Sequence, residues 1–372
     1  MTSPAPIYQY SALTAADQAS LAASVIRVGT ATPVGARYLP QLERTVAARI
    51  GRAAAVAVAS GSSALELAIR GLNIGPGQEV IIPEVGWVSI GTAVANSGAA
   101  VRVAPVVATL TPGWEQIEPL INSATAAVVL AHLRGRPAPG ISRISAELAV
   151  RGIPLIEDCA QAWEVFADGR PAGSWGTVAV FSTQAYKMIA TGEGGLLLAD
   201  DPEFLSMIRA LAGDTRQPFP GAVWRGNHRM TELSAALAQP QLDHLSVLAE
   251  TLRCLQRRTV AALAGLDRLS AVVPEQQDIP ATNGSIVGLW LSAPEQARRL
   301  ADAYHHAGMR SWWPGPGDLH TADAWPSQPD RHLTDVRCYL DLQIPWLPEE
   351  RHPSFATAAA VVAADALGRC AR

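Results

Sequence analysis

The chain has 372 residues, of which 49% are hydrophobic and 17% charged, and its formal net charge is -4. A chain of this length and composition can bury a large core and form a main domain with a smaller second one. Acidic and basic residues are interspersed, so there is neither the basic stripe of a nucleic-acid-binding protein nor a polybasic segment for an anionic membrane.

The cysteines and the start of the chain favour a cytoplasmic protein. Four widely spaced cysteines form no CxxC pair, which predicts reduced thiols rather than a disulfide framework: Cys159, Cys254, Cys338 and Cys370. Residues 1–10 lack the basic start and apolar core of a signal peptide. The Ala- and Val-rich stretches are shorter than the roughly 20 residues of a membrane span. We expect neither export nor membrane binding, and we expect no metal.

One basic residue stands apart from the others. Of the 29 Lys and Arg residues 28 are Arg, and Lys187 is the exception. A guanidinium, whose pKa stays above about 12, cannot lose its proton to attack a carbonyl, whereas an amine can. The composition therefore favours a chemical role for Lys187, although one surface lysine kept by chance would leave the same pattern.

Short β-rich apolar runs alternate with helical patterns between residues 52 and 199, which is typical of βαβ units. We predict strands at 53–59, 79–83, 101–106, 126–130, 153–157, 178–181 and 195–199. Helical patterns between them cover 64–72, 114–121, 141–151 and 202–212. The prediction is an α/β fold with a mainly parallel seven-stranded sheet and helices on both faces.

A change of pattern after residue 230 indicates a second, smaller α+β domain. A helical stretch runs to about residue 263, with Pro240 expected to bend or break it. Beyond it we predict a strand at 289–291, a helix at 294–307, a Trp- and Pro-rich loop at 312–325 and a last helix at 353–367. The predicted domains are 1–245 and 246–372.

Three short segments carry candidate chemistry. Lys187 lies between two predicted strands and is followed by a glycine-rich turn, 192–195, that lets backbone approach a ligand. Asp158 ends a buried strand, where open α/β sheets bind ligands, and would pair with the ring nitrogen of pyridoxal phosphate (PLP). The segment 60–65, Ser-Gly-Ser-Ser-Ala-Leu, joins a strand to a helix and would hold a phosphate. Each segment alone also fits an ordinary hairpin, turn or N-cap.

In combination these segments resemble the DegT/DnrJ/EryC1/StrS family of PLP-dependent sugar and aminocyclitol aminotransferases, over roughly residues 52–245. The family's SGTAAL turn is met at 60–65, its GPGDEVIVP strand at 75–83 and its EDAAQ element at 157–161. Its GSFGD segment is similar to 173–176, its lysine element to 181–195 and its NYRMSELQAA helix start to 227–236. The resemblance implies the aspartate-aminotransferase (fold type I) architecture.

The resemblance also implies roles for individual residues. Lys187 would form the Schiff base with PLP, Asp158 would bond the pyridine nitrogen and Gln161 would lie near the ring hydroxyl. Three serines would hold the phosphate: Ser62, Ser63 and Ser182. Trp87 would stack on the ring, although an indole is also a plausible core residue. Asn227 would reach the phosphate of the other subunit, which predicts a homodimer with shared active sites.

The chain departs from the family pattern around the substrate. Its HLYG element reads His132-Leu-Arg134-Gly here, which replaces an aromatic with a cation, and the Tyr of NYR is His228. Tyr186 precedes the lysine, where Thr is common. Three arginines are candidates for binding a donor carboxylate or an anionic group of the acceptor, each with a solvated surface residue as the alternative: Arg134, Arg229 and Arg310.

The resemblance implies transfer of an amino group from glutamate or glutamine to a keto-sugar or keto-cyclitol, in the biosynthesis of an antibiotic or another secondary metabolite. Three alternatives remain. A PLP-dependent sugar dehydratase of the same family would carry His in place of Lys187. An idle PLP-binding regulatory protein would bind the cofactor without reacting with amino donors, and a PLP-independent α/β protein would not bind it.

Overall fold

The larger part of the molecule is built on one sheet of seven strands. The computed structural model describes residues 37–214, 225–264, 272–274, 281–314, 336–345, 347 and 349–368. The strand order is β1-β9-β8-β5-β4-β2-β3. Its members are β1 (Ala54–Val58), β2 (Glu79–Pro83), β3 (Ala100–Ala104), β4 (Thr125–Ala131), β5 (Leu155–Asp158), β8 (Val178–Ser182) and β9 (Gly195–Ala199). All strands run parallel except β9, which is antiparallel to both β1 and β8. The predicted sheet is therefore confirmed.

The sheet is buried on both faces, which explains why its strands read as continuous apolar runs. In β4, for example, Val129 belongs to one core cluster and its neighbours Val128 and Leu130 to another. One face is covered by α3 (Gly61–Gly71), α4 (Ser89–Ala95) and α7 (Pro202–Leu211). The other is covered by α2 (Tyr38–Ile50), α5 (Trp114–Ile117), α6 (Ile141–Val150) and the start of α8. Helices α2 and α4 were not predicted.

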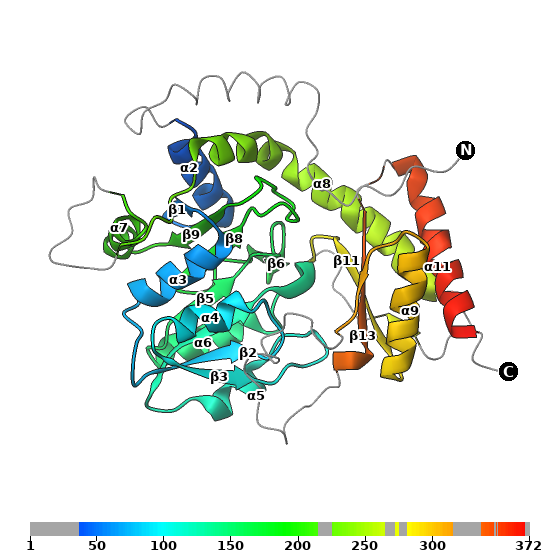
Figure 1. Cartoon of the computed structure of the whole chain (residues 1–372), viewed down its shortest axis with the longest axis horizontal. Helices are drawn as coiled ribbons and strands as arrows, with labels where there is room; N and C mark the ends of the chain where they lie inside the picture. Colours follow the sequence, from blue (N-terminus) through cyan, green and yellow to red (C-terminus); the bar gives the residue numbers. More distant parts are fainter. Residues whose placement is uncertain are drawn as a thin grey trace.

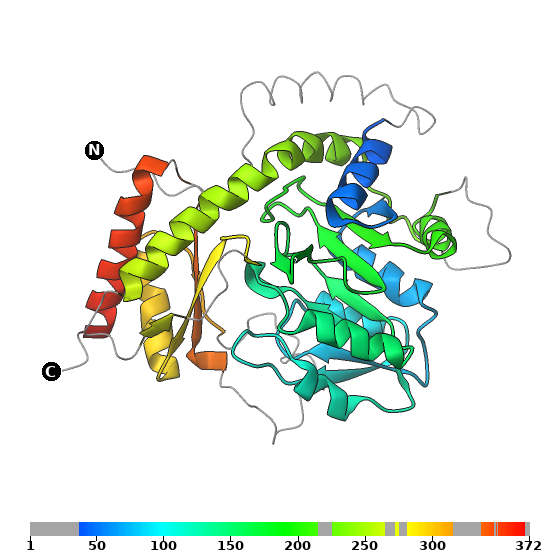
Figure 2. The same cartoon turned by 180° about the vertical axis from the view of Figure 1, so that it is seen from behind.

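Helix α8 (Glu232–Ala264) joins the two parts of the molecule (Figures 1 and 2). It runs without interruption through Pro240, so the chain is not broken there. A bend is visible along its course, as a proline that removes one backbone hydrogen bond would produce. At its first residue, the Glu232 carboxylate accepts bonds of 2.9–3.1 Å from three N–H groups at the start of α2, those of the N-cap Arg37, Tyr38 and Leu39.

The smaller part is a four-stranded antiparallel sheet covered by helices on its outer face. Its order is β10-β11-β13-β12. The strands are β10 (Val272–Pro274), β11 (Ile286–Leu291), β12 (Ser311–Trp312) and β13 (Tyr339–Gln343), and the helices are α9 (Pro294–His306) and α11 (His352–Gly368). The predicted helices at 294–307 and 353–367 are confirmed and the predicted strand at 289–291 is longer. The predicted loop at 312–325 lies mostly outside the described residues. The boundary at residue 245 stays a prediction.

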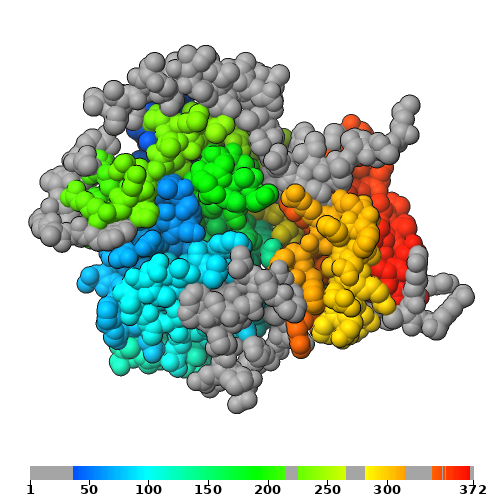
Figure 3. Space-filling view, in the orientation of Figure 1, coloured from blue at the N-terminus to red at the C-terminus, as the bar shows by residue number. Residues whose placement is uncertain are grey.

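The two parts lie against each other (Figure 3). Alternate residues of the small sheet pack on its helices, among them Leu289 and Leu340. The other face presents Trp290 and Tyr339 to the core of the large sheet. No helix within the described ranges is long and apolar enough to cross a membrane.

Candidate active site

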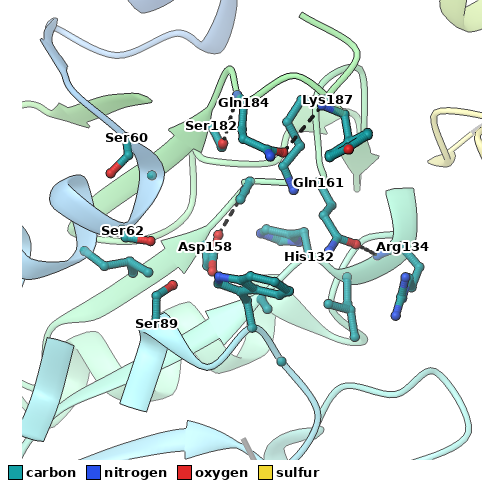
Figure 4. A pocket seen from close by; sticks show the side chains of 18 of the residues that line it. Ser60, Ser62, Ser89, His132, Arg134, Asp158, Gln161, Ser182, Gln184 and Lys187 are labelled. Carbon is teal, nitrogen blue, oxygen red and sulfur yellow. Dashed lines mark hydrogen bonds between the residues drawn. The ribbon is translucent and has the colours of Figure 1, made fainter. Parts of the chain in front are cut away.

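A cavity of about 750 Å³ opens at the carboxyl edge of the large sheet. It is bounded by the turn after β1, the segment between β2 and α4, the end of β5 and the loop between β8 and β9. Its lining includes these polar and aromatic residues: Ser60, Ser62, Trp87, His132, Arg134, Asp158, Gln161, Ser182, Gln184, Tyr186, Lys187, Glu193 and Trp312. Figure 4 shows serines at one end, Arg134 at the other and Lys187 between them.

Lys187 lies in the loop that joins the antiparallel pair β8 and β9. Bonds from Thr183 N to Gly194 O (2.9 Å) and from Lys187 N to Gln184 O (2.8 Å) shape this loop. Gln241 of α8 fixes it from outside by bonding both the N–H and the carbonyl of Ala190. Burial lowers the pKa of the Lys187 amine, and the positive charge of Arg134 acts in the same direction, while Asp158 opposes them. The amine is therefore closer to its neutral, nucleophilic form than a surface lysine.

Asp158 and Glu157 end β5 on opposite sides of the sheet, and the structure gives them different roles. Asp158 lines the cavity and is 6% exposed. Burial raises its pKa, although the N–H of Ala160, bonded to Oδ1 at 2.9 Å, and the charge of Lys187 favour the ionised form. A buried carboxylate beside Lys187 with one oxygen unused by any described residue can take a hydrogen bond from a ligand.

Glu157 is fully buried and its hydrogen-bonding capacity is used within the fold. It accepts bonds from His132 Nε2 (2.8 Å) and from the N–H groups of Gly173 (2.8 Å), Trp175 (2.7 Å) and Gly176 (2.5 Å). Burial acts to raise the pKa of Glu157, but these donors outweigh it and the pKa is lowered. Of the two carboxylates, Asp158 is thus the one that is available to a ligand.

His132, Glu157 and Cys159 lie close enough together to suggest metal ligands. However, Nδ1 of His132 accepts the N–H of Ala138 at 3.0 Å, and this places the ring proton on Nε2, which donates to Glu157. Burial raises the pKa of the Cys159 thiol well above its ordinary value, so the thiolate that a metal needs is disfavoured. The cluster supports the strand end beneath Asp158.

The turn between β1 and α3 forms the serine-rich end of the cavity. Ser60 caps α3 by accepting the N–H of Ser63 at 3.0 Å. Ser62 lines the cavity, whereas Ser63 is not among its lining residues, and the Ser63 hydroxyl lies 3.0 Å from Ser60 Oγ and 3.2 Å from His228 Nδ1. Ser182, at the end of β8, faces the same end. Hydroxyls and free N–H groups at a helix N-terminus bind phosphate.

Two glycines bring this turn against the neighbouring strands. A Cβ on Gly195 would lie 2.5 Å from the carbonyl carbon and oxygen of Ser60, and a Cβ on Gly61 would lie 3.1 Å from Cβ of Ser182. The glycine-rich turn after Lys187 is therefore required for the approach of β9 to the serine turn.

Gln161 and Arg134 are connected at the opposite end of the cavity. The backbone N–H of Arg134 donates to Gln161 Oε1 at 2.8 Å, and Arg134 adopts a left-handed conformation (φ 59°). Its Nε lies 3.0 Å from Oδ2 of Asp341, and its guanidinium carbon lies 3.8 Å from the centre of the Trp312 ring. Arg134 thus joins the large sheet to the small one at the cavity.

The remaining predicted residues fall into two groups. Trp87 lines the cavity and is 54% exposed, so it is not a core residue. Asn227, Arg229 and Arg310 are exposed and are absent from the described lining of the cavity. Arg229 donates to the carbonyl of Gly213 at 2.6 Å. The structure therefore brings Arg134 to the cavity of this chain and leaves Arg229 and Arg310 outside it.

Sequence reasoning gave no role to several residues that border the cavity. Gln184 and Glu193 flank Lys187 on its own loop, and Trp312 comes from the small sheet. Asp341 is not among the lining residues but lies 3.0 Å from Nε of Arg134 behind them. The alternation Tyr-Leu-Asp-Leu-Gln at 339–343 is a strand signal with a polar face, and it could have placed Asp341 on that face.

The donor set fits PLP. The cavity offers hydroxyls at the N-terminus of an 11-residue helix for a phosphate, a buried carboxylate for a ring nitrogen, and an amine of lowered pKa for an aldehyde. The exposed indole of Trp87 supplies an aromatic surface at the mouth.

Comparison with known proteins agrees with this fit. One relative is L-glutamine:2-deoxy-scyllo-inosose aminotransferase from Streptomyces lividus, 34% identical over 61% of this chain and 55% of its own length. UDP-N-acetyl-3-dehydro-alpha-D-glucosamine 3-aminotransferase from Acidithiobacillus ferrooxidans is 30% identical over 86% of each chain.

Solved structures extend the likeness over almost the whole chain. DesV from S. venezuelae has a TM-score of 0.83 and 26% identity, and the match covers 97% of this chain and 99% of that one. 3-Amino-5-hydroxybenzoic acid synthase, at 24% identity, shares the fold with a TM-score of 0.83 over 96% and 97% of the chains.

The fold is therefore that of the PLP-dependent aminotransferases, as the resemblance implied. Residues 14–311 match the DegT/DnrJ/EryC1/StrS aminotransferase family, and the chain belongs to this family of PLP-dependent transaminases.

Proposed function

We propose that the protein transfers an amino group from glutamate or glutamine to the ketone of a sugar or cyclitol. The observation that carries the proposal is the position of Lys187, an amine of lowered pKa that lines one cavity together with the serine turn and the buried carboxylate of Asp158. The relatives named above act on a keto-cyclitol and on a nucleotide-linked keto-sugar, which supports this acceptor class. Antibiotic or other secondary-metabolite assembly is the setting we propose.

Each group of residues in the cavity would have a separate role in binding PLP or moving a proton. Ser62 and Ser182, with the N-terminus of α3, would hold the phosphate, and Trp87 would cover one face of the ring. Bound PLP supplies a ring that withdraws electrons from the carbon bearing the amino group. Asp158 would keep the ring nitrogen protonated. The neutral Nζ of Lys187 would take a proton from the substrate carbon and deliver it to the carbon on the other side of the shared nitrogen, so that the same group serves as base and then as acid.

We further propose a homodimer in the cytoplasm. Asn227 is exposed and lies outside the cavity of its own chain, which agrees with a contact to the phosphate in a second subunit. The described cysteines Cys159, Cys254 and Cys338 form no disulfide, which agrees with a reducing compartment.

The test is the visible absorption of the purified protein loaded with PLP, before and after adding glutamate or glutamine, beside Lys187→Ala. We expect a band that amino donors bleach in the wild type, and a loss of turnover by about 10²–10⁴ in the variant. Arg143→Gln, at an exposed ion pair with Glu115, is the matched control. A band that ignores every amino donor would favour a regulatory PLP-binding protein.

A further inference from the structure

Arg134 borders two cavities that meet at Lys187. Besides the main cavity it lines a second one of about 210 Å³, which lies toward the small sheet and is bounded there by Asn283, Ser285 and Gln343. Lys187 lines both cavities as well. Arg134 and Lys187 therefore face the same space in both cavities.

Two neighbours hold the guanidinium of Arg134, Asp341 at its Nε edge and Trp312 on one face. The edge carrying Nε lies 3.0 Å from Asp341 Oδ2, and the face is stacked 3.8 Å from the Trp312 ring centre. Within the described part of the chain no hydrogen bond holds Nη1 or Nη2. The guanidinium therefore offers a pre-oriented pair of donors, the geometry that binds a carboxylate with two parallel bonds.

Asp341 is suited to this positioning role. It is 2% exposed, so its charge needs compensation within the protein. Oδ1 accepts the Tyr339 hydroxyl at 2.5 Å, while Oδ2 faces Arg134. Because the Tyr339 bond holds the carboxylate in place, Asp341 keeps a negative charge 3.0 Å from Nε of Arg134, and this charge attracts the guanidinium to its position at the cavity.

Among the basic side chains around the cavities, Arg134 is the candidate for binding an anionic group of a substrate. Among the described residues that line them, Lys187 and Arg134 are the Lys and Arg side chains. Lys187 is committed to the amino-transfer chemistry. His132 uses both ring nitrogens within the fold.

We propose that Arg134, positioned by Asp341 and Trp312, binds a substrate carboxylate beside Lys187. This inference rests on the proposed function, in which the amino donor always carries a carboxylate and the acceptor can carry one. The residue is a departure from the aromatic of the family pattern, so the assignment concerns this chain in particular.

The experiment titrates glutarate, a dicarboxylate without an amino group, into protein loaded with PLP and into protein loaded with pyridoxamine phosphate. The first form receives the donor and the second receives the acceptor. The variants are Arg134→Gln, Arg134→Lys and Asp341→Asn, with the surface variant Arg143→Gln as control. Calorimetry gives the dissociation constant, and steady-state kinetics with glutamate and glutamine give KM and kcat.

For Arg134→Gln we expect glutarate binding to weaken by about tenfold or more, as for loss of a charge-assisted pair. Arg134→Lys keeps the charge without the paired donors and should recover part of the affinity. Asp341→Asn should raise the KM of the substrate that supplies the carboxylate with little change in kcat, since it disturbs binding rather than the proton transfer. A change confined to the PLP form identifies the donor as the source of the carboxylate, and one confined to the other form identifies the acceptor.

Equal glutarate affinity of wild type and Arg134→Gln in both forms, or failure of the wild type to bind glutarate, overturns the inference. If Arg134→Gln does not load PLP, the same comparison is decided by Arg134→Lys and Asp341→Asn. Glutarate binding that depends on Arg134 in a protein whose PLP band no amino donor bleaches would instead refute the proposed function.

Discussion

Neutralising Glu157 and neutralising Asp158 should have opposite effects on thermal stability, although the two residues are adjacent. Glu157→Gln keeps the shape of the side chain but turns an NH₂ group toward two of the four donors that the carboxylate accepts. His132 cannot relieve the clash by moving its proton, because Nδ1 already accepts the N–H of Ala138.

The expected cost follows from the bonds lost. Two hydrogen bonds to a charged acceptor at about 1.5–3 kcal/mol each give a loss of roughly 3–6 kcal/mol in the free energy of unfolding. At about 2 °C per kcal/mol for a large domain, the melting temperature should fall by roughly 6–12 °C. Burial raises the pKa of the Asp158 carboxyl, so its ionised form destabilises the folded protein. Asp158→Asn removes this charge, and the cofactor-free variant should therefore melt at the same or a higher temperature than wild type. Its transaminase activity should fall.

Thermal unfolding of both variants without cofactor, together with their turnover when loaded with PLP, checks the contrast. Because the pKa of Glu157 is lowered in the folded state, its contribution should be present above about pH 4.3 and disappear as the pH falls through the folded pKa. Equal melting temperatures for Glu157→Gln and wild type, or a comparable drop in Asp158→Asn, would refute the division of roles.

Three further outcomes are expected. Lys187→Met should stabilise the cofactor-free protein at neutral pH, because a lysine whose pKa is lowered by folding costs stability wherever the unfolded chain is protonated. The stabilisation should disappear above about pH 10.4. Unfolding measured as a function of pH tests this, and a stability difference that is constant across pH would contradict it. Gly195→Ala should displace the Ser60 turn at a cost of about 1–3 kcal/mol and weaken PLP binding, which fluorescence titration of the cofactor detects; an unchanged PLP affinity would show that the turn tolerates the contact. Glu232→Ala should destabilise α2 by about 1–2 kcal/mol, measured by denaturant unfolding, since it leaves three helix N–H groups without their acceptor; wild-type stability would mean that water replaces it.

The large sheet was predictable because its strands, apart from the half-exposed edge strand β3, are buried on both faces and are therefore largely apolar runs. The choice of Asp158 over Glu157 also followed from the sequence, since the last residue of a strand faces the edge of the sheet. The small sheet was less accessible to such reasoning. Strands of two or three residues, such as β10 and β12, carry too few positions for a period to emerge.

The substrate end of the site depends on contacts between distant segments. Arg134 was singled out as a departure from a family pattern, but its ion pair spans more than 200 residues to Asp341, and no local pattern encodes it. For Arg229, the bond to Gly213 arises from the way two loops meet. Pro240 was expected to bend or break the helix, and the helix continues because packing along both sheets outweighs one missing hydrogen bond.

The pairing of β9 with both β1 and β8 determines the distance between two segments that border the cavity. Gly195 is paired with Val58 on one side, just before the serine turn, and with Ser182 on the other, just before the lysine loop. One residue thus sets the spacing between the turn proposed to hold the phosphate and the loop that carries Lys187. Because a slip of one residue reverses every side chain in a strand, an error in the register of β9 would misplace both segments at once. The register of β9 therefore determines the positions of the serine turn and of the lysine loop together.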